Sequence, residues 1–109
     1  MKKNNLEVLI KESDNQVRIG ISGFLDAHTA HILENAIKAQ IENRIYNIKI
    51  DFENLDYISS AGFGVFMEFI EEIREKGGDL VLVNMKEKIH KLFELLGFDL
   101  LFKINSVEE

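Results

Sequence analysis

Apolar residues occupy every second position over residues 6–10 and again over residues 17–21, with the polar cluster Ser13-Asp14-Asn15 between the two runs. Spacing of two is typical of strands that bury one face, and the cluster is typical of a turn. We therefore predict a β-hairpin at the start of the chain, with its second strand ending near Gly23.

Three later segments have the hydrophobic spacing of amphipathic helices. The first opens at Asp26-Ala27-His28-Thr29, with Asp26 and Thr29 as candidate N-caps. The second runs from about residue 61 to residue 76, where Gly77-Gly78 is expected to stop it, and the third runs from residue 86 to about residue 96. The positions of the third helix predicted to face inward are Ile89, Leu92, Phe93 and Leu96.

Strands are predicted between and after these helices. Residues 46–52 alternate, residues 79–84 form a continuous apolar run typical of a strand covered on both faces, and residues 101–104 form a short final strand. Residues 54–58 are interpreted as a connection, and residues 106–109 as a frayed tail. The order ββαβαβα(β) predicts one α/β domain over residues 1–109, with a four- to five-stranded mixed sheet and about three helices.

Composition removes several classes of protein. The 109 residues contain no cysteine, which excludes disulfides, cysteine-ligated metals and thiol catalysis. The net charge of −6 argues against nucleic acid as a partner. No apolar run approaches the ~20 residues of a membrane helix, and no signal peptide is visible, so we expect a cytoplasmic protein with no membrane insertion.

The segment Ile58-Ser59-Ser60-Ala61-Gly62-Phe63-Gly64 departs from what packing requires. Serines at a helix start are ordinary capping residues, but each glycine inside a helix costs about 0.8–1 kcal/mol relative to alanine. Tight packing against the sheet can account for Gly62, whereas Gly64 falls on the outward side. An exposed position without a side chain, close to a serine hydroxyl, suits close approach by another molecule.

The sequence gives little support for catalysis or for metal binding. Ser60 lacks the Gly-x-Ser-x-Gly elbow and has no histidine placed beside it, so we predict no catalytic residues. The glycines lack the lysine of a phosphate-binding loop. His28, His31 and His90 do not make a ligand set by spacing, and we predict neither a metal nor a cofactor.

Asp26 lies in the loop that precedes the first helix. Its simplest role is that of an N-cap. Because loops at equivalent ends of neighbouring strands lie side by side, Asp26 is also placed to flank the serine pair.

Nearly the whole chain resembles the STAS domain, and more narrowly the small bacterial anti-sigma factor antagonists. The resemblance rests on Gly23-Phe24-Leu25-Asp26, on residues 59–64, on Lys76-Gly77-Gly78-Asp79 with the apolar run after it, and on the segment from Lys91 to Phe98. No single motif is specific, but their order and spacing are. Aligning the family's Gly-x-Gly on Gly62-Phe63-Gly64 puts Ser60 at the phosphoacceptor position, and puts Ser59 where the family has an aspartate.

The resemblance implies a function without chemistry of its own. The protein would bind an anti-sigma factor that is also a serine kinase, release a sigma factor, and be switched off by phosphorylation of Ser60, with Ser59 as second choice. A serine phosphatase would act on the phosphorylated form. The implied partner-binding residues are Asp26, Ser59, Ser60, Ala61, Gly62, Phe63 and Gly64.

Two alternatives stay open at this point. The absence of the family's aspartate at Ser59 is compatible with a STAS-type scaffold or interaction module in another signalling or transport assembly, which is not phosphorylated. A ligand- or nucleotide-sensing domain would instead bind its ligand near Asp26, Ser60 and Gly62.

Overall fold

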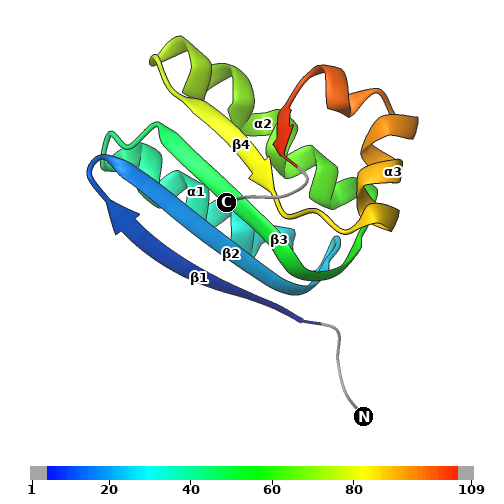
Figure 1. Ribbon diagram of the computed structural model, residues 1–109. Helices are drawn as coiled ribbons and strands as arrows, with labels where there is room; N and C mark the ends of the chain where they lie inside the picture. The colour runs from blue at the N-terminus through cyan, green and yellow to red at the C-terminus, as the bar shows by residue number, and fades with distance from the viewer. Residues whose placement is uncertain (1–4, 106–109) are drawn as a thin grey trace.

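Within residues 5–105, which the computed structural model describes, five strands form one sheet and helices follow the later strands (Figure 1). The strands are β1 (Leu6–Ser13), β2 (Gln16–Leu25), β3 (Asn47–Ile58), β4 (Asp79–Val83) and β5 (Lys103–Asn105). The helices are α1 (Ala30–Glu42), α2 (Ser60–Glu75), α3 (Glu87–Leu95) and a short 3-10 turn, η1 (Phe98–Leu100). The predicted α/β class and the order ββαβαβα(β) are confirmed.

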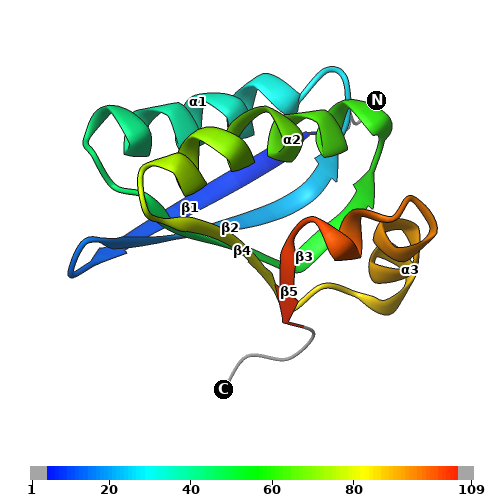
Figure 2. The same ribbon diagram turned by 90° about the horizontal axis from the view of Figure 1, so that it is seen from above.

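The sheet keeps the order of the sequence, β1-β2-β3-β4-β5. β1 and β2 form the predicted antiparallel hairpin, and Asp14 and Asn15 make its turn with φ values of 45° and 65°. The other three strand pairs are parallel. Right-handed crossovers that advance through the sheet in one direction put their helices on one side. Figure 2 shows α1 and α2 side by side over the same face.

The core lies between that face and the helices. Alternate residues of β2 and β3 point into it, including the fully buried Ile19, Ile50 and Phe52. Phe52 contacts Phe66 of α2 and Phe93 of α3, with ring centroids 5.6 and 5.9 Å apart. These ring contacts pack the end of the sheet against α2 and α3, so the start of α2 lies on a well-packed part of the core.

Two strand ends differ from the prediction. β3 continues to Ile58, so residues 54–58 are strand and not a connection, and β2 continues past Gly23 to Leu25. Register shifts between Gly20 and Ser22 and between Gly23 and Phe24 accompany a change of spacing in β3, whose last buried residues, Phe52, Leu55 and Ile58, are three apart. That spacing conceals the period of two from which a strand is predicted.

The C-terminal segment also needs correction. Ile89 and Phe93 are buried as predicted, but Leu92 and Leu96 are 39% and 53% exposed. α3 has only nine residues and buries one narrow stripe, so the neighbouring leucines stay outside. The last strand begins at Lys103 and not at residue 101, and the predicted tail at 106–109 lies outside the described residues.

Candidate functional site

The loops that follow β2 and β3 meet at one edge of the sheet. Leu25 pairs with Ile58 at the ends of the two strands, and the Ser59 N–H donates a 2.9 Å hydrogen bond to the Leu25 carbonyl oxygen. Asp26 therefore begins its loop beside Ser59, as the sequence predicted. The strand pairing holds the two segments together.

The Asp26 carboxylate organises the turn before α1. Its Oδ1 accepts hydrogen bonds from the N–H groups of His28 (2.9 Å) and Thr29 (3.2 Å). The buried Thr29 hydroxyl donates to the Phe24 carbonyl at 2.7 Å and accepts from the Asp26 N–H at 2.9 Å. α1 begins only at Ala30, with Thr29 at the N-cap position, so Asp26 caps the preceding turn and not the helix itself. The carboxylate is thereby held in one place beside the serine pair.

The two serines differ in access. Ser59 is the N-cap residue of α2 in an extended conformation, yet its side chain makes no capping hydrogen bond. Its Oγ is buried, and it has no hydrogen-bond partner in the described part of the chain. Ser60, the first residue of α2, is exposed. Only the Ser60 hydroxyl is presented to a macromolecule in this conformation.

The two glycines of α2 also differ, and in the way that the sequence indicated. A Cβ at Gly62 would lie 2.7 Å from Leu25 Cγ and 2.8 Å from Ile58 Cγ1, so the absence of a side chain lets α2 sit directly on the strand ends. A Cβ at Gly64 would have nothing within 4 Å. Gly64 is exposed one turn from Ser60, where packing within the domain does not require a glycine.

The other two residues of the loop lie further inside. Ala61 is half-buried, and Phe63 is buried against Phe93 and Phe98, with ring centroids 4.7 and 5.3 Å away. The Phe63 side chain therefore points into the core. The surface of the predicted partner site consists of Ser60, Gly64, the edge of Ala61 and the Asp26 turn.

Sequence reasoning missed Tyr57 and Asp56 at this end of the sheet because it read residues 54–58 as a connection. Tyr57, 47% exposed, packs on Phe24 with ring centroids 5.7 Å apart. Asp56 accepts a 2.8 Å hydrogen bond from Lys86, and this bond and the charge of Lys86 lower the pKa of the Asp56 carboxyl below its usual range. An aromatic pair and a surface ion pair thus lie at the same end of the sheet as the serine loop.

Over residues 5–105, no three histidine, cysteine, aspartate or glutamate side chains come together as a metal site. No helix in the same range is long and apolar enough to cross a membrane. The chemistry available at the loop is that of an exposed hydroxyl, free helix-terminal backbone and a fixed carboxylate.

Comparison with known proteins gives one consistent result. The family model described as "STAS domain" matches residues 7–109. The anti-sigma-B factor antagonist of Listeria monocytogenes is 31% identical over 106 residues, which cover 95% of this chain and 92% of that protein. The protein of the same name in Bacillus subtilis is 27% identical, with 96% and 95% covered.

Solved structures agree on the fold. An anti-sigma factor antagonist from Mycobacterium paratuberculosis has a TM-score of 0.82 at 23% identity, with 92% of this chain and 85% of that chain covered. SpoIIAA, also an anti-sigma factor antagonist, matches in its unphosphorylated form (TM-score 0.69, 82% and 83% covered) and in its phosphorylated form (TM-score 0.72, 90% and 90% covered), both at 22% identity.

Proposed function

This chain belongs to the STAS domain family, and from that premise we propose that it is an anti-sigma factor antagonist. It binds an anti-sigma factor serine kinase in the cytoplasm and so releases a sigma factor. Phosphorylation of Ser60 switches it off, and a serine phosphatase restores it. The protein is a regulatory binding partner and not an enzyme.

The observation that carries this proposal is the exposed Ser60 hydroxyl at the start of α2, one turn from the uncovered Gly64. A kinase needs access to the hydroxyl and to the backbone around it. Ser60 and Gly64 offer both, whereas the buried Oγ of Ser59 offers neither. This difference supports Ser60 over Ser59 as the phosphoacceptor.

Phosphorylation at this position would act on the partner contact and leave the domain folded. A phosphate adds a charge of about −1.5 to −2 and three acceptor oxygens. At the first residue of a helix this charge meets the positive end of the helix dipole and unpaired N–H groups, so the domain tolerates it. A partner surface packed against Ser60 and Gly64 would instead meet an added charge and bulk, which costs several kcal/mol where that surface is desolvated.

The test uses the cognate anti-sigma factor, ATP and four forms of the protein. Wild type and Ser59→Ala should incorporate one phosphate, and Ser60→Ala should incorporate none while still forming the complex. Ser60→Asp should bind more weakly than wild type. If neither wild type nor Ser60→Ala forms a complex and no phosphate is incorporated, the proposal is wrong.

A STAS-type interaction module that is not phosphorylated is the second candidate, and Ser59 favours it. The family carries an acidic residue at this position, whereas Ser59, with its buried Oγ, supplies no charge beside the acceptor. Under this alternative, Ser60→Asp leaves partner binding unchanged. The same binding measurement therefore separates the two functions.

A further inference from the structure

β1 forms a long edge of the sheet. Figure 1 shows it along the rim, and the sheet order has no described strand beyond it. The opposite edge, β5, has only three residues, whereas β1 has eight. Natural proteins protect a long edge with proline, a bulge or charged side chains, because its free N–H and C=O groups can pair with another strand. The chain has no proline, and β1 pairs with β2 without a register shift, so only charged residues remain for this purpose.

The backbone groups on the free edge belong to every second residue of β1. The Phe24 N–H donates a 2.9 Å hydrogen bond to the Asn5 carbonyl oxygen, and the pairing of β1 with β2 continues from there in constant register. Hydrogen bonds in an antiparallel pair fall on alternate residues of each strand. The odd-numbered residues of β1 therefore bond to β2, and the even-numbered ones present their N–H and C=O groups to the free edge: Leu6, Val8, Ile10 and Glu12.

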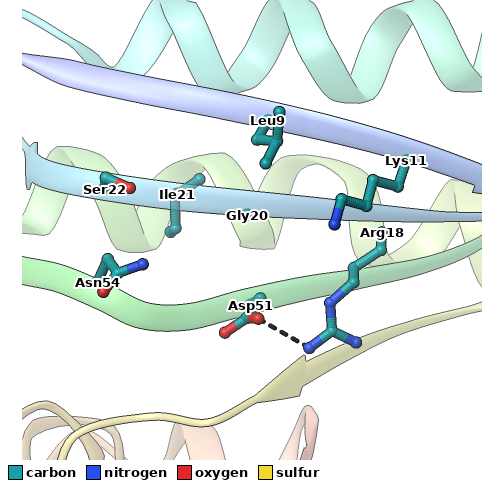
Figure 3. A pocket seen from close by; sticks show the side chains of 8 residues that line it. All are labelled: Leu9, Lys11, Arg18, Gly20, Ile21, Ser22, Asp51 and Asn54. Carbon is teal, nitrogen blue, oxygen red and sulfur yellow. Dashed lines mark hydrogen bonds and ion pairs between the residues drawn. The ribbon is translucent and has the colours of Figure 1, made fainter.

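Two large apolar side chains are exposed in the middle of this strand. Leu9 is 64% exposed and Ile10 is 39% exposed. Leu6 and Val8 pack on the core, so Leu9 lies on the opposite face of the sheet, where it lines a pocket of about 140 Å³ together with Lys11 (Figure 3). An exposed apolar stretch on a long edge is a surface that a further strand covers.

The sequence of β1 is complementary to itself when two copies run antiparallel. A two-fold axis through Leu9, perpendicular to the sheet, puts Val8 opposite Ile10 of the second copy, and their free backbone groups then form hydrogen bonds. The same register puts Glu7 opposite Lys11 of the second copy, and the symmetry repeats this pair. A shift of two residues would put Leu9 opposite either Glu7 or Lys11 and leave the charges unpaired.

Strand β2 does not offer these two charges an opposite charge at the paired position. Glu7 lies opposite Ser22, and Lys11 lies opposite Arg18. Opposite charges on directly opposed residues stabilise a sheet, and like charges weaken it. A second copy of β1 would therefore supply each of the two residues with the cross-strand partner that its own hairpin lacks.

We propose that the free edge of β1 is the contact surface of a homodimer, in which β1 pairs antiparallel with β1 of a second copy around Leu9. A contact through one strand is at the small end of specific interfaces, so we expect a dissociation constant of about 10 μM to 1 mM. Ser60 follows β3, two strands in from β1. The contact does not include the serine loop, and the inference does not depend on the proposed function.

Sedimentation equilibrium of the full chain, from about 10 μM to about 1 mM, measures the association. Leu9→Arg should weaken the dimer at least about tenfold, because two arginines would lie opposite each other on the axis. The matched control is Leu100→Arg, which changes a leucine that is 90% exposed on η1. This control should change the dissociation constant less than about twofold.

Reversing the charges tests the register. Glu7→Lys puts a lysine opposite Lys11 of the second copy in both symmetric pairs and should weaken the dimer about tenfold. General repulsion between two acidic chains would predict the opposite, because this variant is less negative than wild type. Glu7→Lys/Lys11→Glu restores both pairs and should return the dissociation constant to within about threefold of wild type.

Hydrogen exchange followed by NMR locates the contact on the backbone. The amides of Val8 and Ile10 should exchange about two- to tenfold more slowly at about 1 mM protein than at about 10 μM. The amide of Leu9 is bonded to β2 in both states, so its exchange should change little. The same spectra show whether each variant keeps the wild-type fold.

Several results would overturn the proposal. They are a chain that stays monomeric up to about 1 mM, a dimer lost in Leu100→Arg but kept in Leu9→Arg, and a double charge variant that associates no more tightly than Glu7→Lys. Slower exchange of Val8 and Ile10 only after the cognate anti-sigma factor is added, without a dimer, would also overturn it and would assign the edge to a strand of that partner.

Discussion

Gly62 and Gly64 lie two residues apart in the same helix and so face different sides of it, and we predict that the same substitution has different effects at the two positions. Alanine gains about 0.8–1 kcal/mol in helix propensity at either site. At Gly62 the new methyl would lie 2.7 Å from Leu25 Cγ and 2.8 Å from Ile58 Cγ1, and both of these side chains are buried. At Gly64 the methyl meets nothing within 4 Å.

The change in the free energy of unfolding is the gain in helix propensity minus the cost of packing the new methyl group. Overpacking a filled core costs about 1–3 kcal/mol, and only the Gly62 variant incurs that cost. Gly64→Ala should therefore raise the free energy of unfolding by about 0.5–1 kcal/mol, whereas Gly62→Ala should leave it unchanged or lower it by up to about 2 kcal/mol. The difference between the two variants isolates the packing cost, because the propensity gain is common to both.

Urea denaturation followed by far-ultraviolet circular dichroism measures both variants under the same conditions. A Gly62→Ala protein as stable as Gly64→Ala would refute the close seating of α2 on the strand ends. Gly64→Ala should in addition weaken capture of the anti-sigma factor despite its greater stability, because its methyl stands on the proposed contact surface. Unchanged capture would remove Gly64 from that surface.

Three further predictions concern single side chains. Ser59→Ala should raise the free energy of unfolding by up to about 1 kcal/mol in urea denaturation, because it removes a buried hydroxyl without a partner in the described structure; a loss of stability would contradict this. Asp26→Ala should lower that free energy by about 1 kcal/mol and Asp26→Asn by much less, since asparagine keeps the acceptor oxygen; equal losses would assign the effect to charge. The hydrogen bond with Glu34 raises the pKa of the Glu68 carboxyl, and burial and the charge of Glu34 raise it further. Protonated Glu68 therefore stabilises the fold at acidic pH, and this contribution is lost as the pH rises through the raised pKa. Glu68→Gln should thus be more stable than wild type by about 0.5 kcal/mol or less near pH 7, with no advantage below the ordinary glutamate pKa, and a pH-independent difference would contradict the pairing.

The alternating and helical hydrophobic patterns predicted the class and the order of elements because each element buries one face. The pattern failed where the backbone is irregular. Leu55 and Ile58 are both buried in β3 but three residues apart, because the register with β2 shifts, and no spacing rule for a regular strand detects this. Leu92 and Leu96 show the opposite error, because the pattern predicted them to be buried and tertiary packing leaves them exposed.

The candidate site was predictable to a similar extent. The serine loop and Asp26 stood out by residue type, and strand pairing brought them together. The Gly-x-Gly alignment favoured Ser60 over Ser59, but the sequence could not show that the two hydroxyls differ in burial.

The central claim is that one exposed hydroxyl, that of Ser60, switches partner binding. Phosphosite mapping by mass spectrometry, after incubation with the cognate anti-sigma factor and ATP, tests it most directly when the phosphorylated and unmodified forms are then compared for binding. We expect one phosphate, on Ser60, and loss of the complex in the phosphorylated form. Phosphate on Ser59, or a phosphorylated form that binds as tightly as the unmodified protein, would contradict it.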